Sequence, residues 1–368
     1  MAGMNELLSL GQSVWLDFIR RDMVRGGELK ELVGNGLRGL TSNPSIFEKA
    51  IAGGDEYDDA LRRALRENPD ADTVSLFEAL AIEDIREAAD LLRPVWDASD
   101  GTDGLVSLEV SPHLAHEEAA TFDEAHRLWT AVDRPNLMIK VPATAEGIKA
   151  IERLTADGIN VNATLMFSLA HYEGVARAWL RGLERAEHPE RIASVASFFV
   201  SRVDTLVDRK LDAMGTPEAG ALRGRAAVAN AKLAWQRFRE IFHGPDFEPL
   251  RQRGAHVQRV LFGSTSTKDP AYSDVKYVEE LIGAETVNTL PPDTLEAFLD
   301  HGEARASLGE GMDAARAVMA DLARVGIDMD AVTETLQEDG VRKFADAFDK
   351  LMGAIDAKRE QLLQPAGR

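Results

Sequence analysis

Short apolar runs bounded by turn residues recur along the chain, and longer amphipathic stretches separate them. In the run NLMIKVPAT (136–144), Leu137, Ile139 and Val141 alternate with other side chains, which is the two-residue period of a β-strand. Lys140 stands at the centre of this run, and a charged ammonium in a buried strand requires an explanation. The pattern predicts eight strands, at 13–19, 37–44, 104–111, 136–144, 159–168, 192–202, 259–267 and 286–292.

The stretches between these runs have apolar residues at helical spacing, most clearly at 75–96 and 225–242. Alternating strands and helices predict a parallel sheet, and eight strands predict a closed (β/α)₈ barrel of the α/β class. A doubly wound open sheet is the structural alternative. Neither a GxGxxG motif after the first strand nor a P-loop is present, which counts against it.

The chain of 368 residues exceeds the about 250 residues that such a barrel requires. The excess falls in helical insertions at 45–98, 216–256 and 303–363, and no low-complexity linker separates them. We therefore expect 1–368 to form a single TIM-barrel domain with helical insertions and a C-terminal helix. The segment 341–363 is strongly amphipathic, and its plain interpretation is a helix packed on the exterior of the barrel. A helix that seals the barrel mouth is the alternative.

The formal net charge of −20 argues against nucleic acid and anionic membranes as partners. Cysteine is absent, which excludes disulfides, thiolate nucleophiles and cysteine-ligated metals. The histidines show no compact metal-ligand spacing, so neither a metal nor another cofactor is predicted. The N-terminal segment is charged too early for a signal peptide, and no apolar run is long enough to span a membrane. A soluble cytoplasmic protein is the expectation.

Polar residues occupy one face of several predicted strands. Glu109 lies opposite the apolar face of the third strand, Lys140 opposite that of the fourth, and Asn162 and Thr164 opposite that of the fifth. Asp17 lies opposite the apolar face of the first strand. If the apolar faces pack outward on the helices, the polar faces point into the barrel. These side chains then converge at the C-terminal rim, where barrel active sites lie.

Each of these residues also has a structural interpretation. Asp17 alone fits a solvated edge residue, and Glu109 with Lys140 fits an interior salt bridge between neighbouring strands. The polar side chains of the fifth strand would then only satisfy backbone groups at the barrel end. Convergence of several such residues at one end of one barrel favours a functional site.

A lysine in a barrel interior loses hydration of its ammonium form, which favours the neutral, nucleophilic amine. Such an amine attacks a carbonyl and forms a protonated Schiff base, which permits cleavage of a carbon–carbon bond beta to the imine. The reaction needs two proton carriers, one for carbinolamine dehydration and one for the hydroxyl proton released in cleavage. Two carboxylates on separate strands suit these roles.

Several motifs together resemble the transaldolase family of the class I, Schiff-base aldolase superfamily. LTSNPSIF (40–47) resembles the family's T-x-N-P signature, and NLMIKVPAT resembles the segment with its Schiff-base lysine. GINVNATLMFS (158–168) and SFFVSR (197–202) match its fifth and sixth strands. The length and the SVWLD opening (13–17) are most similar to the long bacterial form, including actinobacterial proteins.

The resemblance implies catalytic roles for four residues. Lys140 forms the Schiff base with the ketose donor. Asp17 accepts the donor's hydroxyl proton during cleavage, and returns one during condensation. Glu109 relays protons through a water that Thr164 also holds.

The resemblance also implies a substrate-binding set. Asn43 and Asn162 hydrogen-bond the donor hydroxyls and the dihydroxyacetone unit, and Thr41 and Ser197 line the same pocket. Arg202 binds the sugar phosphate as a bidentate donor. The structural alternative for Arg202 is pairing with Asp204 or another acid.

One stretch departs from the family pattern. Many members have a second phosphate-binding arginine just after strand seven, whereas this chain has FGSTSTKDP (262–270). Lys268 is the nearest cation and is expected to substitute as a point charge. Backbone and hydroxyl donors of residues 264–267 are an alternative phosphate site. Lys268 would then be an ordinary surface lysine at the start of a helix.

These observations predict a transaldolase of the pentose phosphate pathway. It would transfer a dihydroxyacetone unit from sedoheptulose 7-phosphate to glyceraldehyde 3-phosphate, giving erythrose 4-phosphate and fructose 6-phosphate. A fructose-6-phosphate-type aldolase on the same barrel and a non-catalytic sugar-phosphate-binding barrel are the alternatives. The expected partners are phosphorylated sugars, and the pattern is compatible with a monomer or a homodimer.

Overall fold

The computed structural model describes residues 3–52 and 54–363, and its parallel strands close into one barrel in chain order. Each strand pairs with the next, and the last pairs with the first. The predicted (β/α)₈ barrel is confirmed, and the open sheet is excluded. The strands are β1 (Gln12–Leu16), β2 (Gly39–Leu40), β3 (Leu105–Glu109), β4 (Leu137–Pro142), β5 (Val161–Met166), β6 (Ser194–Phe199), β7 (Arg259–Gly263) and β8 (Thr286–Leu290).

The strands end earlier than the sequence pattern predicts, and the second differs most. The run 37–44 was expected to be extended, but β2 has two residues and pairs with β3 only at Leu105 and Val106. Beyond β2, the hydroxyl of Ser42 donates to the carbonyl oxygen of Ser107 (2.7 Å). This side-chain bond replaces a ladder bond, so the chain leaves the sheet and begins the next helix.

The barrel interior has an apolar lower layer and a polar upper layer. The lower layer is a separate buried cluster that contains Trp15, Leu105, Met138, Leu261 and Val287. The outward residues of the same strands belong instead to the large core shared with the helices. The predicted division of strand faces is therefore confirmed.

Trp15 explains the glycine that faces it. A Cβ atom on Gly39 would lie 2.4 Å from the indole ring of Trp15, far closer than two carbon atoms can approach. The barrel interior at this level is filled by the indole, and β2 must present no side chain to it.

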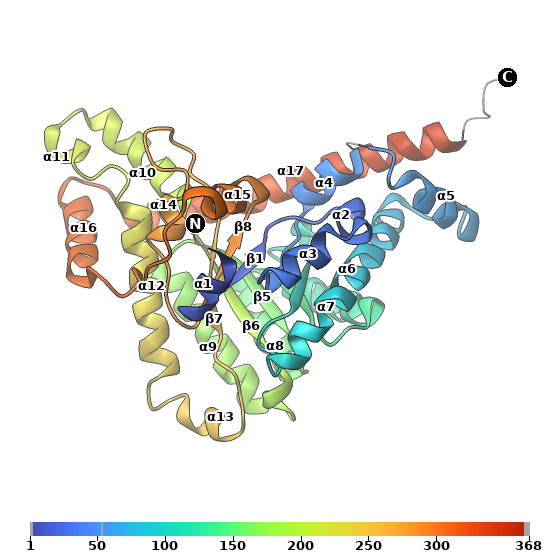
Figure 1. The fold of residues 1–368 in the computed structure, drawn as a ribbon, viewed down its shortest axis with the longest axis horizontal. Coiled ribbons are helices and arrows are strands. Elements are labelled where there is room, and N and C mark those ends of the chain that lie inside the picture. The colour runs from blue at the N-terminus through green and yellow to red at the C-terminus, as the bar shows by residue number, and fades with distance from the viewer. Residues whose placement is uncertain (1–2, 53, 364–368) are drawn as a thin grey trace.

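Helices surround the barrel (Figure 1). Several begin with a side-chain cap, as where Thr144 accepts from the amide of Gly147 (3.0 Å). Those outside the predicted insertions are α1 (Met4–Ser9), α2 (Arg21–Gly26), α3 (Glu28–Gly34), α7 (Glu118–Val132), α8 (Ala145–Ala156), α9 (Leu169–Arg185), α10 (Ser201–Met214), α14 (Lys276–Glu279) and α15 (Pro292–His301), with short 3₁₀ turns at Pro112–Leu114 and Pro189–Arg191.

The predicted insertions are helical in the structure. None of the helices within the described residues combines the length and apolarity that a membrane span requires. The inserted helices are α4 (Pro44–Ala52), α5 (Asp58–Glu67), α6 (Thr73–Ala98), α11 (Pro217–Gly220), α12 (Ala226–Phe242), α13 (Glu248–Gln252), α16 (Met312–Arg324) and α17 (Met329–Leu363).

The C-terminal helix α17 does more than cover the barrel's exterior. It begins at Met329, earlier than predicted, and runs beside α4 toward α5 (Figure 1). The side chain of Gln337 donates to the carbonyl oxygens of Ala143 and Leu165, which lie at the C-terminal ends of β4 and β5 (both 3.0 Å). Packing on the exterior is therefore only part of the helix's role, and these contacts with carbonyls at the barrel mouth agree with the alternative of a helix over the mouth.

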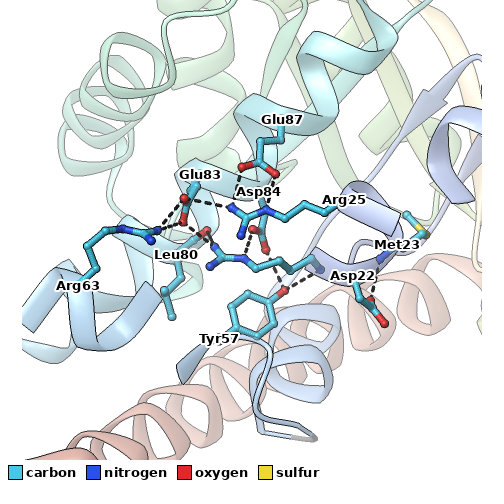
Figure 2. Close-up of polar contacts among 10 residues, drawn as sticks. Asp22, Met23, Arg25, Tyr57, Arg63, Leu80, Glu83, Asp84 and Glu87 are labelled. Atoms are coloured by element: carbon cyan, nitrogen blue, oxygen red, sulfur yellow. Dashed lines mark hydrogen bonds and ion pairs between the residues drawn. The ribbon is translucent and has the colours of Figure 1, made fainter. Parts of the chain in front are cut away.

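A buried ionic network joins α2 to α6. Arg21 donates through Nε to Asp84 (2.7 Å), and the hydroxyl of Tyr57 donates to the second oxygen of the same carboxylate (2.8 Å). Arg25 and Glu87 form a paired arrangement at the rim of this network (Figure 2). Because α2 follows β1 after a short loop, the network fixes the position of α2, and with it the loop that leaves β1 at the barrel mouth.

Candidate active site

A cavity of about 770 Å³ opens at the C-terminal end of the barrel. Its walls come from the ends of several strands, from the loops after them, and from α4, α15 and α17. This is the end at which the sequence predicted convergence. The predicted site residues that line it are Asp17, Thr41, Asn43, Lys140, Thr164, Ser197, Arg202 and Lys268.

Lys140 projects from β4 into the barrel and is 4 % exposed. Its Nζ donates to the carbonyl oxygen of Ser42 (3.3 Å) and lies 3.3 Å from Oε2 of Glu109. The ammonium also lies 5.5 Å from the ring centroid of Phe344 on α17. The amine is thus held in a confined setting between one carboxylate, a backbone carbonyl and one aromatic ring.

Glu109 is the register partner of Lys140 on β3, and its side chain is 2 % exposed. Burial raises the pKa of Glu109 to about 7, the nearby Lys140 acts in the opposite direction, and the negative charge of Asp17 raises it slightly. The contact with Lys140 lacks hydrogen-bond geometry, and both carboxylate oxygens are without a partner among the described residues. A carboxyl group in this state exchanges protons near neutral pH. It does not line the cavity directly.

Asp17 lies just beyond the end of β1 and lines the cavity. The hydroxyl of Thr41 donates to Asp17 Oδ1 (2.8 Å) and lies 3.2 Å from the hydroxyl of Thr289 on β8. These two threonines orient the carboxylate, so it is not the freely solvated edge residue of the structural interpretation.

Asn43 and Thr164 contribute polar groups to the cavity wall. The amide oxygen of Asn43 accepts from the backbone of Ile46 (3.0 Å), which leaves its NH₂ group for a ligand. The hydroxyl of Thr164 on β5 is buried and is without a partner among the described residues. An unsatisfied buried hydroxyl beside the cavity is costly unless water or substrate contacts it.

Asn162 differs from the other predicted binding residues because it lies below the cavity floor. Its NH₂ group donates to Ser107 (3.0 Å), and its oxygen accepts from the hydroxyl of Ser197 (2.6 Å). Ser197 does line the cavity. In this structure, Asn162 therefore orients Ser197 from beneath.

Two predicted cations face the cavity from neighbouring elements. Arg202 lies in the first turn of α10 rather than in a strand, and its guanidinium stacks 5.1 Å from the ring centroid of Phe199. Burial lowers the pKa of Arg202, and Asp17 acts in the opposite direction. Asp204, its proposed structural partner, instead accepts from Tyr277 (2.9 Å) and lies 3.5 Å from Lys276.

Lys268 lies in the loop after β7 and donates to the hydroxyl of Ser266 (2.5 Å). Burial lowers the pKa of Lys268, and the positive charges of Arg202 and Lys49 lower it further. Lys268 lines the cavity, and the next helix begins only at Lys276. It is therefore not the surface lysine at a helix start of the structural alternative.

Sequence reasoning missed several residues that the fold brings to the site. Thr289 shares the inward face of β8 with Val287, so the strand period contained a signal for it. Ser42, Phe344 and Lys49 had no local signal, because a backbone carbonyl and two distant helices provide them.

The assembled groups suit imine chemistry on a carbonyl compound. A confined amine lies beside a carboxyl group that titrates near neutrality, and a second carboxylate lies on the cavity wall. Cations and hydroxyl groups further out suit a phosphate. Among residues 3–52 and 54–363, no cluster of three or more histidine, aspartate and glutamate side chains is arranged to hold a metal ion.

Comparison with known proteins gives a consistent result. Residues 14–355 match the family model described as transaldolase/fructose-6-phosphate aldolase. The chain is 50% identical over 351 residues to a transaldolase of Thiobacillus denitrificans, covering 94% of this chain and 97% of the relative. It is 50% identical over 358 residues to a transaldolase of Frankia alni (96% of each chain), and 45% identical over 353 residues to one of Mycobacterium bovis (94% of each).

Proposed function

The chain belongs to the transaldolase/fructose-6-phosphate aldolase family, and we propose that it is a transaldolase that works through a Schiff base on Lys140. It transfers a dihydroxyacetone unit from sedoheptulose 7-phosphate to glyceraldehyde 3-phosphate. The products are erythrose 4-phosphate and fructose 6-phosphate. One observation carries this proposal. Lys140 lies toward the carboxyl end of a barrel strand, is only 4 % exposed, and has its Nζ 3.3 Å from Oε2 of the buried Glu109.

The first half-reaction begins when the neutral amine of Lys140 adds to the ketose carbonyl. The carbinolamine loses water and becomes a protonated imine. Asp17 then takes the proton of the hydroxyl group beta to the imine, and the adjacent carbon–carbon bond breaks. Its electron pair moves toward the imine and gives an enamine, while the shortened aldose phosphate leaves.

The second half-reaction reverses these steps with a new aldehyde. The enamine carbon attacks the aldehyde of glyceraldehyde 3-phosphate, and Asp17 returns its proton to the new hydroxyl group. Water then hydrolyses the imine and frees Lys140. Thr41 and Thr289 keep the carboxylate of Asp17 in the orientation that both proton transfers require.

Glu109 supplies and removes protons during carbinolamine formation and dehydration. Its pKa of about 7 allows it to donate and accept at neutral pH. Both its oxygens and the hydroxyl of Thr164 are without partners among the described residues, which suits a shared water molecule between them. The proposed relay therefore rests on two buried groups whose remaining hydrogen bonds are unused by the protein.

The substrate's polar groups meet the cavity wall. Asn43 and Ser197 contact the hydroxyls of the dihydroxyacetone unit, and Asn162 supports Ser197. Arg202 and Lys268 bind the phosphate. Neither forms an ion pair with a described carboxylate, so both charges are available to an anion.

Reductive trapping tests the proposal. Incubation with fructose 6-phosphate and borohydride should leave a reduced three-carbon adduct on the peptide that contains Lys140, identified by mass spectrometry. Lys140→Arg keeps the charge and should show no adduct and no turnover. An unmodified Lys140, or an active Lys140→Arg variant, would refute the nucleophile assignment.

Release of dihydroxyacetone separates transfer from simple aldol cleavage. The family model includes fructose-6-phosphate aldolase, so this alternative has direct support. A transaldolase keeps its enamine until an aldehyde arrives, and free dihydroxyacetone should be minor without an acceptor. Substantial release without an acceptor would instead identify an aldolase that uses the same Lys140 adduct.

A further inference from the structure

A third cation, Lys49, lines the same cavity as Arg202 and Lys268. It lies near the end of α4, a helix that starts at Pro44 immediately after Asn43. Because Asn43 caps this helix from within the site, the position of Lys49 is coupled to the cavity wall. The lysine thus belongs to a rigid element of the mouth.

These three cations lack counterions in a chain that is rich in acids. The sequence has 62 acidic residues against 42 lysines and arginines. Some other cations do form ion pairs, as Lys358 does with Asp58 (2.7 Å). Within the described residues, Lys49, Arg202 and Lys268 form no ion pair at 4.0 Å or less.

The cations are also close enough to affect one another. Burial lowers the pKa of Lys268 most, and the charges of Arg202 and then Lys49 lower it further. Clustered like charges destabilise the unliganded site, whereas a bound dianion relieves the repulsion. An arrangement of this kind is selective for anions.

The carboxylates on the cavity wall leave this cationic side free. Asp274 pairs with His301 (2.9 Å), and Asp17 accepts from Thr41. Asp293 lies in the first turn of α15. Among the described residues, none of these carboxylates forms an ion pair with Lys49, Arg202 or Lys268, so the three cations remain available to an anionic group of the substrate.

We propose that Lys49 is a specificity-determining residue, which binds the substrate's phosphate together with Arg202 and Lys268. This inference rests on the proposed sugar-phosphate function and deepens it. Lys49 acts as a point charge on a flexible stem, so it favours phosphorylated over unphosphorylated sugars without fixing the orientation of the reacting carbon.

Paired acceptors test the proposal through specificity. With saturating sedoheptulose 7-phosphate as donor, Lys49→Ala should raise the KM for glyceraldehyde 3-phosphate about tenfold, as expected for one lost charged contact. The KM for unphosphorylated glyceraldehyde and the kcat should stay unchanged. Lys49→Arg should restore most of the preference. Equal losses for both acceptors would overturn the proposal.

The matched control is Lys30→Ala. Lys30 lies on α3, is exposed, is outside the cavity wall and forms no ion pair within the described residues. This variant should behave as the wild type in every assay. If Lys49→Ala is indistinguishable from Lys30→Ala, Lys49 binds no phosphate.

Binding of inorganic phosphate provides a readout that needs no turnover. Calorimetry should show about tenfold weaker binding to Lys49→Ala than to the wild type or to Lys30→Ala. A wild type that forms no Lys140 adduct refutes the proposed function alone, because phosphate binding still tests Lys49. A normal adduct with unchanged phosphate affinity refutes the role of Lys49 alone.

Discussion

Two buried ion pairs in this barrel are built in opposite ways. Arg21 and Asp84 lie 2.7 Å apart, and Tyr57 supplies a further bond to the carboxylate (Figure 2). Lys140 and Glu109 lie 3.3 Å apart without hydrogen-bond geometry, and both carboxylate oxygens are without partners among the described residues. The first carboxylate is fully engaged by the protein, whereas the second is left for other contacts.

Burial affects both acids in the same direction, so their difference lies in their partners. It raises the pKa of Asp84 to about 6 and that of Glu109 to about 7. Arg21 also stacks on Tyr57 at 4.7 Å and donates to the carbonyl of Leu80 (3.2 Å), which holds the pair rigidly. We infer that the pair with the satisfied carboxylate stabilises the fold. The pair with the unsatisfied carboxylate keeps a group available for proton transfer, at a cost in stability.

The largest expected effect is on activity. Lys140→Met should reduce turnover by about 10⁴-fold or more, because the other two lysines of the cavity, Lys49 and Lys268, lie on its phosphate-binding side and not beside Glu109. Its stability should change little, since the remaining Glu109 takes up a proton when its neighbouring cation is lost. Steady-state kinetics and chemical denaturation measure both. A severe loss of stability would show that this pair is structural after all.

Arg21→Met should give the reverse pattern. Removing one partner of a well-bonded buried pair costs about 3–5 kcal/mol of unfolding free energy. The kcat of the folded fraction should be retained, because Arg21 lines no part of the cavity. Urea denaturation with activity assays well below the midpoint tests this. Lost kcat in a fully folded variant would mean that the network controls the site directly.

Glu109→Gln should lower kcat by about 10²–10³-fold through loss of proton transfer. It should also change the pH dependence of stability. In the native state, burial raises the pKa of Glu109 to about 7, whereas the unfolded carboxyl group releases its proton near its ordinary pKa of 4.5. The stability that the bound proton contributes is thus lost as pH rises through this range.

The melting temperature of Glu109→Gln relative to the wild type should therefore increase from pH 4.5 to about pH 7 and then level off. Glutamine does not titrate, so it avoids the cost of a buried carboxylate. A constant difference across this range would show that Glu109 does not hold its proton in the native state.

Tyr57→Phe should have the smallest effect. It removes the hydroxyl that donates to Asp84 but keeps the ring under Arg21, so the expected cost is about 1–2 kcal/mol. Activity should not change. Thermal denaturation measures this loss of stability. A loss equal to that of Arg21→Met would show that the hydroxyl, and not the ion pair, provides most of the network's stabilisation.

Local residue patterns predicted most of the barrel and much of its site. The two-residue period distinguished Lys140 from the outward residues of β4, and the same argument located Glu109 and Thr164. It did not predict that β2 would have only two residues, because Ser42 bonds to Ser107 on the neighbouring strand β3. It also did not separate Ser197 on the cavity wall from Asn162 beneath it, since strand period gives the face but not the depth.

The sequence by itself determined the strand and helix order, the faces of the strands, and the inward position of Lys140, because alternation and turn residues act over a few positions. Only the tertiary structure decided that α17 brings Phe344 over Lys140 and that α4 brings Lys49 to the cavity that Lys268 also lines. The same holds for the 3.3 Å gap between Lys140 and Glu109. These features depend on how distant helices pack and how burial is distributed, and no short segment of the chain contains that information.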